Sequence, residues 1–249
     1  MRIRKRIGSR GTIAALIVGS LLGLEGHTQT EGPGELTSAD LQLSAVAVRY
    51  MKDLDLLVFE QRVKGIAGKT TPQPAGQPEG APVFAHVFRT SLQPQDIGFG
   101  PTAGLVALAV TSHPDFDDTP LWDENTDGKR DNDGVVYHSH WVVLVEDPRT
   151  PAGLAVKEFA ANGASITVPA THPGMPLYLD SPGHSVVLEG DTLRVLVPAR
   201  RVNNKTSFTY DGVTAFLRHS QASGQPMLGV HTVMSTAAKG EALGYKVLR

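Results

Sequence analysis

Residues 135–145 read VVYHSHWVVLV, and this stretch decides the fold class. Its β-branched and aromatic side chains, with a periodicity near 2, are typical of a strand and not of an amphipathic helix. Comparable stretches recur along the chain, at residues 45–50, 56–63, 83–88, 105–110, 154–159, 165–168, 185–188, 192–197, 207–210, 213–217, 227–234 and 245–248. About a dozen short strands between Gly, Pro and Asn/Asp turns predict an all-β protein. A single β-sandwich of the immunoglobulin-like or jelly-roll type is the favoured architecture, and a closed barrel built from the same strands is the alternative.

The N-terminus has the layout of an export signal. Five basic residues precede the apolar residues 12–24 (TIAALIVGSLLGL), which is the order of a secretory signal peptide. A membrane-spanning helix needs about 18–20 apolar residues, so this run is short for a permanent anchor. We therefore predict a signal peptide over residues 1–26, a polar linker over 27–40, and one domain over 41–249. The protein is expected to be exported to the periplasm or the extracellular space.

The charge balance narrows the possible partners. The chain has 23 Lys and Arg against 25 Asp and Glu, a net charge of −2. Loss of residues 1–26 removes five basic residues and one acidic residue, which leaves a net charge of about −6. Nucleic acids and anionic membranes reward clustered basic residues, so we expect neither as a partner after cleavage. The chain has no Cys, which excludes disulfides and thiolate metal sites.

The insertion over residues 112–134 is strongly acidic, and its centre reads DENTDGKRDND from Asp123 to Asp133. It resembles the D-x-[DN]-x-D-G type of calcium-binding loop. Oxygen ligands alternate along such a loop, and Gly128 stands where a sharp turn is needed. The resemblance implies Ca²⁺ bound by side-chain oxygens and one carbonyl, from Asp123, Asn125, Asp127, Lys129 (carbonyl), Asp131 and Asp133.

The match is to the loop alone. Position 12, which is a bidentate Glu in EF-hands, is Gly134 here, and Asp133 stands one place earlier. The flanking residues read as strand and turn instead of helix. We therefore predict a calcium ion that stabilises the insertion, without a helix-loop-helix fold or a switching role. A solvated acidic loop without an ion is the alternative.

A second metal site is suggested by His138 and His140, which lie two residues apart in a predicted strand and so project from the same side. Strands of β-barrel metal proteins present two imidazoles to Zn²⁺, Cu²⁺ or Fe²⁺ in this way. The candidates for a third ligand are His86 within its own predicted strand, then His113 and His184, and last Glu146. Packed imidazoles on a polar sheet face are the alternative interpretation.

Two short motifs around these histidines resemble those of the cupins, a superfamily of metal-binding β-barrels. Gly134-x3-His138-x-His140-x5-Glu146-x6-Gly153 is similar to the first cupin motif, and Gly190-Asp191-x6-Pro198 to the second. The spacing before His138 is two residues short, that before Glu146 is one or two long, and Asn203 stands where the second motif has its His. The resemblance implies a barrel with a metal held by histidines and a carboxylate.

Two functions follow from these patterns. The first is an exported, calcium-stabilised β-sandwich that acts by binding a ligand, such as a carbohydrate, a protein or a metal ion, and not by catalysis. The second is a cupin-like metalloenzyme or metal-binding protein that uses the H-x-H strand.

Overall fold

The computed structural model describes residues 36–73, 78–114, 127–129, 134–160, 166–238 and 243–249. The predicted signal peptide and most of the predicted linker lie outside these ranges. None of the helices within them has the length and apolar character needed to cross a membrane.

The described residues form strands joined by turns and short 3₁₀ helices. The strands are β1 (Leu43–Met51), β2 (Leu56–Val63), β3 (Pro82–Thr90), β4 (Leu105–Ser112), β5 (His138–Glu146), β6 (Leu154–Val156), β7 (Leu179–Asp180), β8 (Ser185–Glu189), β9 (Thr192–Pro198), β10 (Thr209–His219), β11 (Leu228–Thr236) and β12 (Tyr245–Lys246). The 3₁₀ helices are η1 (Ala39–Leu41), η2 (Pro94–Ile97) and η3 (Ala199–Val202). The all-β prediction is confirmed.

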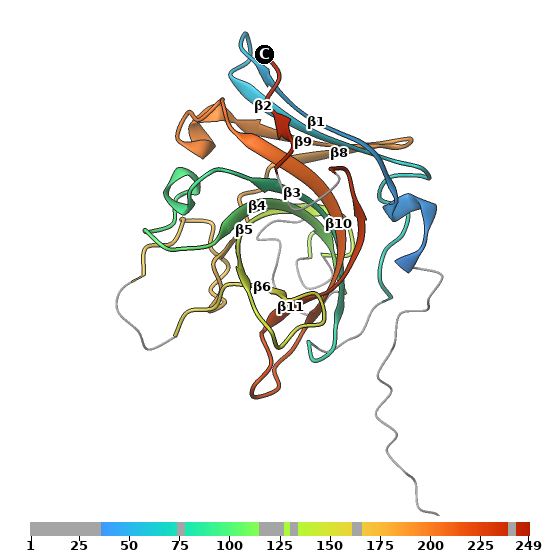
Figure 1. Cartoon of the computed structure of the whole chain (residues 1–249), viewed down its shortest axis with the longest axis vertical. Coiled ribbons are helices and arrows are strands. Elements are labelled where there is room, and N and C mark those ends of the chain that lie inside the picture. Colours follow the sequence, from blue (N-terminus) through green and yellow to red (C-terminus); the bar gives the residue numbers. More distant parts are fainter. Residues whose placement is uncertain (1–35, 74–77, 115–126, 130–133, 161–165, 239–242) are drawn as a thin grey trace, which may run out of the picture.

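Six antiparallel strands close into a barrel. They follow the order β11-β6-β5-β4-β3-β10, and β10 pairs with β11 to complete the ring, as Figure 1 shows. Closure gives each of these six strands a partner on both sides. The favoured sandwich of two open sheets is therefore corrected to a barrel with an added sheet. The sequence pattern did not separate the two, because both alternate apolar residues in the same way.

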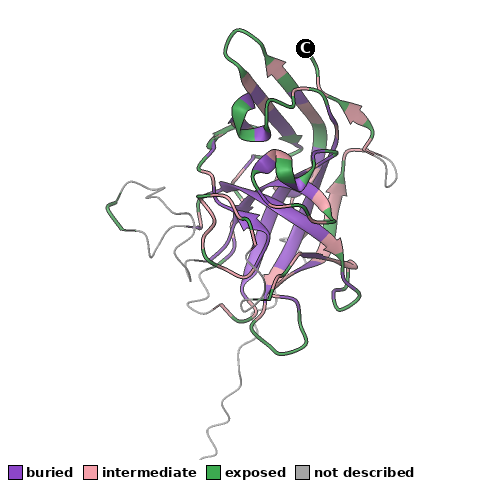
Figure 2. Ribbon diagram, turned by 90° about the vertical axis from the view of Figure 1, so that its left-hand side faces the viewer, coloured by how far each residue is buried: buried purple, intermediate pink, exposed green. Residues whose placement is uncertain are grey.

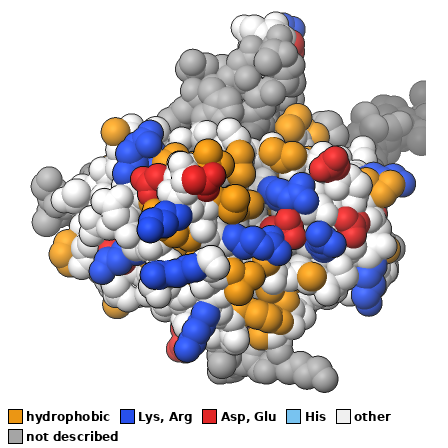
Figure 3. Space-filling view, turned by 90° about the horizontal axis from the view of Figure 1, so that it is seen from above, with side chains coloured by type: hydrophobic (Ala, Val, Ile, Leu, Met, Phe, Trp, Pro, Cys, Tyr) orange, Lys and Arg blue, Asp and Glu red, His pale blue; other side chains and the backbone are white. Residues whose placement is uncertain are grey.

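The added sheet, β1-β2-β9-β8, packs on the outside of the barrel at the top of Figure 1. Buried hydrogen bonds join the two: the backbone N–H of Val48 donates to the Tyr210 hydroxyl at 2.8 Å, and Gln61 Nε2 donates to the Val87 carbonyl at 2.9 Å. On the exposed side of this sheet, basic and acidic side chains are interspersed with hydrophobic ones (Figure 3). Arg194, for example, pairs with Glu60 at 2.8 Å.

Strands β3, β4, β5 and β10 separate two apolar cores, because successive side chains point to opposite faces. The outer core lies between the barrel and the added sheet, and it holds large aromatic side chains such as Phe84, Phe88 and Trp141. The barrel interior holds their neighbours in sequence, such as Ala85 and Val87. Figure 2 shows that the barrel strands between the two cores are mostly buried.

Strand β10 runs unbroken through Asp211-Gly212, where the sequence pattern had indicated a turn between two strands. Asp211 is fully buried and accepts a hydrogen bond from Arg89 at 2.6 Å. A Cβ atom on Gly212 would lie 2.8 Å from a methyl group of Val46, so glycine allows β1 to approach β10. Asp211 thus forms a buried ion pair, and Gly212 permits a close contact between β1 and β10, instead of the two forming a turn.

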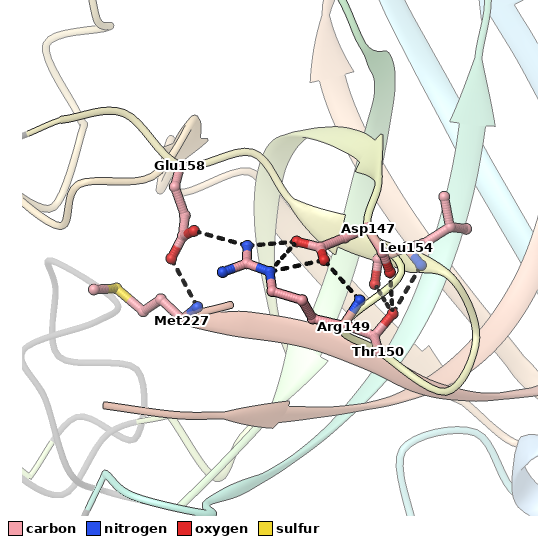
Figure 4. A network of polar contacts seen from close by, with 6 residues as sticks. All are labelled: Asp147, Arg149, Thr150, Leu154, Glu158 and Met227. Carbon is pink, nitrogen blue, oxygen red and sulfur yellow. Dashed lines mark hydrogen bonds and ion pairs between the residues drawn. The ribbon is translucent and has the colours of Figure 1, made fainter. Parts of the chain in front are cut away.

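The barrel is closed most sparsely between β6 and β11, where one residue pair, Gly229 with Ala155, forms the ladder. A polar network spans this seam (Figure 4). Arg149 bonds Asp147 at 2.6 Å and Glu158 at 3.3 Å, and Glu158 accepts the backbone N–H of Met227 at 2.9 Å. The network thereby ties the turn after β5 to the segment that leads into β11.

Candidate metal centre

Three histidines meet at the wall of the barrel. His113 directly follows β4, and His138 and His140 project from the neighbouring strand β5. One ring nitrogen from each lies within 4.8 Å of the others, and all three residues are buried. The structure therefore brings together the predicted H-x-H pair and one of the predicted third ligands.

Backbone carbonyls orient two of these rings. Nδ1 of His113 lies 3.0 Å from the Pro114 carbonyl, and Nδ1 of His138 lies 2.8 Å from the Val136 carbonyl. A carbonyl oxygen only accepts hydrogen bonds, so each Nδ1 carries a hydrogen. In the neutral rings, both Nε2 atoms then carry lone pairs, which is how protein histidines are commonly held for a metal. The Thr111 hydroxyl also lies 3.5 Å from Nε2 of His138.

The two Nε2 atoms face each other at 3.2 Å. Lone pairs at that distance repel unless a proton or a metal cation lies between them. Two nitrogens bound to one zinc ion at about 2.0–2.1 Å, with tetrahedral angles, stand roughly 3.3 Å apart. The distance of 3.2 Å between the Nε2 atoms of His113 and His138 is close to that value.

His140 completes the group as a neutral ring. Its Nδ1 lies 3.0 Å from the Ser181 hydroxyl. Burial, followed by repulsion from the positive charge that His138 or His113 carries when it is protonated, holds the pKa of His140 well below its usual range. The neutral form is the one that binds metals.

The other predicted ligands lie elsewhere. His86 projects from the opposite face of β3 into the outer core, where its Nδ1 lies 3.0 Å from Gln61 Oε1 and its ring meets Tyr137 edge-on. Burial lowers the pKa of His86 to about 4. His184 accepts a hydrogen bond from Trp141 Nε1 at 3.1 Å, and Glu146 is exposed at the end of β5.

Nothing in the sequence indicated one part of the centre, and another part was ranked too low. Ser181 lies 41 residues from His140, and no local pattern marks it as a partner. His113 ranked behind His86 because it lies just beyond its predicted strand. The pairing of Thr111 with His138 across β4 and β5 is what places His113 beside the H-x-H pair.

The acidic insertion is described only in part. Asp123, Asn125, Asp131 and Asp133 lie outside the described residues, so the calcium site stays a prediction. Within the described part, the N–H of Lys129 donates to Asp127 Oδ1 at 2.9 Å. The two ends of the insertion meet where the N–H of His113 donates to the Gly134 carbonyl at 2.8 Å.

The interior of the barrel contains a cavity of about 250 Å³. His113 and His140 belong to its lining, and most of the remaining lining is aliphatic. The metal-ligand group therefore borders an apolar space.

Comparisons with known proteins found no relative of this chain. No family model matches the chain, and no curated protein or solved structure is similar to it at a significant level.

Proposed function

We propose that the protein binds one divalent transition-metal ion through His113, His138 and His140. The observation that carries the proposal is the 3.2 Å approach of two Nε2 atoms whose Nδ1 hydrogens point to carbonyls. Without a cation, this arrangement requires a shared proton in a buried site.

The ligand set selects the kind of metal. Three imidazoles without a carboxylate suit Zn²⁺, Cu²⁺ or Fe²⁺, whereas Ca²⁺ and Mg²⁺ prefer oxygen ligands. A metal held by three histidines keeps a coordination position for water or an organic ligand and can supply Lewis-acid chemistry there. Ser181 and the carbonyls of Pro114 and Val136 would keep the three rings in place.

A cupin-like site is supported in part. The barrel and the two histidines on β5 agree with the resemblance of residues 134–153 to the first cupin motif. Glu146 is exposed, and His113 occupies the third position instead. We infer a three-histidine variant of such a centre.

Export and calcium binding stay separate proposals. Residues 1–26 would direct the chain out of the cytoplasm, and the acidic insertion would hold Ca²⁺. The insertion begins next to His113 and ends shortly before His138. A calcium ion there would order the segment that links these two ligands.

Elemental analysis of the untagged chain, purified without chelator, tests the metal site. We expect about one equivalent of zinc, copper or iron in the wild type and its loss in His138→Ala and His140→Ala. His231→Ala removes a half-buried histidine of β11 outside the group and should keep the metal. Equal metal content in all four proteins would contradict the proposal.

A further inference from the structure

We propose that the barrel interior receives a small, uncharged, largely apolar molecule whose single oxygen or nitrogen donor points to the histidine centre. This inference rests on the proposed metal site for the orientation of the ligand, but not for its apolar binding. Four observations lead to it: the composition of the lining, its volume, its charge and its polar end.

The lining of the cavity is aliphatic on all six barrel strands. Val87, Ala109, Val142, Val156, Ala215 and Val230 represent β3, β4, β5, β6, β10 and β11 in turn. No Phe, Tyr or Trp side chain is among the described lining residues. Such a surface gains free energy when it is removed from water, at about 25 cal/mol per Å².

The volume suits a ring or a short chain. An engineered apolar cavity of about 150 Å³ stays dry and binds benzene. The barrel cavity, at about 250 Å³, accommodates a molecule somewhat larger. Close-packed interiors rarely contain voids this large, so the space is more consistent with a binding site than with a packing defect.

The charge of the lining selects a neutral ligand. Arg89 is the one Lys, Arg, Asp or Glu side chain among the described lining residues, and it is paired with buried Asp211 at 2.6 Å. A charged group in the middle of the cavity would meet no unpaired opposite charge, and its burial would be costly. We therefore exclude fatty-acid anions and similar ions as preferred occupants.

The polar ends of the cavity differ. Two residues of β3 mark these ends. Phe84 pairs with Ser112, which precedes His113, and so marks the histidine end, whereas Arg89 pairs with Ala107 and marks the other end. Phe84 and Arg89 are separated by about 17 Å of extended strand.

At the Arg89 end the charge is balanced by Asp211, although the buried Nε of Arg89 has no hydrogen-bond partner among the described residues. A donor atom of the ligand is expected at the histidine end, because a lone pair binds the open position of the proposed metal there more strongly than a single N–H.

Binding of toluene and 4-methylphenol to the purified chain, measured by calorimetry, tests the inference. The two probes share one apolar body and differ by one oxygen. We expect toluene to bind the zinc-loaded and the EDTA-treated protein with similar Kd. We expect 4-methylphenol to bind the zinc-loaded protein about tenfold tighter than the EDTA-treated protein.

Two substitutions that fill the cavity from different strands, Ala215→Leu and Ala85→Leu, should each weaken toluene binding about tenfold or more. The second variant guards against misfolding of the first, and a thermal melt of each checks the fold. Ala45→Leu makes the same change at an exposed position of β1 and should bind toluene like the wild type.

The outcomes separate the two proposals. Absence of toluene binding to either form of the wild type, or unchanged binding in both filled variants, overturns the cavity inference while leaving the metal site intact. Equal affinity of 4-methylphenol with and without zinc overturns the predicted orientation. Failure of the wild type to retain zinc, copper or iron contradicts the metal proposal, whereas toluene binding in EDTA still supports the cavity.

Discussion

The two faces of the barrel wall are built from the same strands and yet differ in packing. On the outer face, Phe84 and Phe88 of β3 and Trp141 of β5 pack against the added sheet. Phe59 of β2 contacts two of them edge-on, with ring centroids 5.3 Å from Phe88 and 6.1 Å from Trp141. On the inner face, the alternate residues Ala85 and Val87 border a cavity.

The difference teaches where stability and function reside. Large aromatic side chains, together with Leu and Val, fill the space between the layers, and each buried aromatic ring removes a large apolar area from water. Small aliphatic side chains leave the interior hollow and surround the proposed ligand beside the histidine centre. The outer core therefore stabilises the fold, and the inner face offers a binding site.

The largest difference in stability between the two faces is expected from substitutions at neighbouring positions of β3. Phe88→Ala removes a fully buried ring from the outer core and should lower the free energy of unfolding by about 3–5 kcal/mol. Val87→Ala removes fewer atoms and enlarges an existing cavity, so it should cost about 1–2 kcal/mol. Urea unfolding of both variants measures the difference, and equal losses would refute the assignment of stability to the outer core.

Lowering the pH should reduce the free energy of unfolding, because two histidines are buried in or beside the outer core. Burial lowers the pKa of His86 and of His184 to about 4 each, below the value near 6.5 of an unfolded histidine. As the pH falls, the unfolded chain therefore binds protons first. The stabilisation is complete above about pH 6.5 and is lost progressively towards pH 4, at up to about 1.4 kcal/mol per pH unit for each histidine.

Urea unfolding of the wild type and of His86→Gln in EDTA at pH 7.5 and pH 5 isolates the contribution of His86, because the histidines of the metal centre are present in both proteins. The wild type should lose roughly 2 kcal/mol per buried histidine over this interval. His86→Gln keeps a polar group beside Gln61 and should show a shallower loss. An identical pH dependence in both proteins would show that His86 is not held neutral by its site.

The smallest effect is expected at the seam between β6 and β11. Arg149 is 41% exposed, and exposed ion pairs contribute about 0–1 kcal/mol. Arg149→Ala should therefore lower the free energy of unfolding by less than about 1 kcal/mol, measured in urea. A loss as large as that of Phe88→Ala would place a major part of the stability at the seam and overturn the comparison.

Much of the strand pattern was readable from the chain itself. The ranges 56–63, 192–197 and 245–248 nearly match or overlap β2, β9 and β12, because alternating β-branched residues need no distant partner to indicate a strand. The two-residue strand β7 was missed because it is defined by its pairing with β5. The turn expected at Asp211-Gly212 was wrong because Arg89 and Val46 approach from other strands.

The sequence by itself determined the all-β class and the shared orientation of His138 and His140, since both depend on the local period of a strand. Only the tertiary structure decided that six strands close into a barrel, because closure depends on pairings between strands far apart in sequence, β10 with β3 and β11 with β6. The tertiary structure also decided which histidine joins His138 and His140. The sequence favours His86 over His113 as a ligand, but the strand register and the pleat place His113 beside the H-x-H pair and His86 on the opposite face.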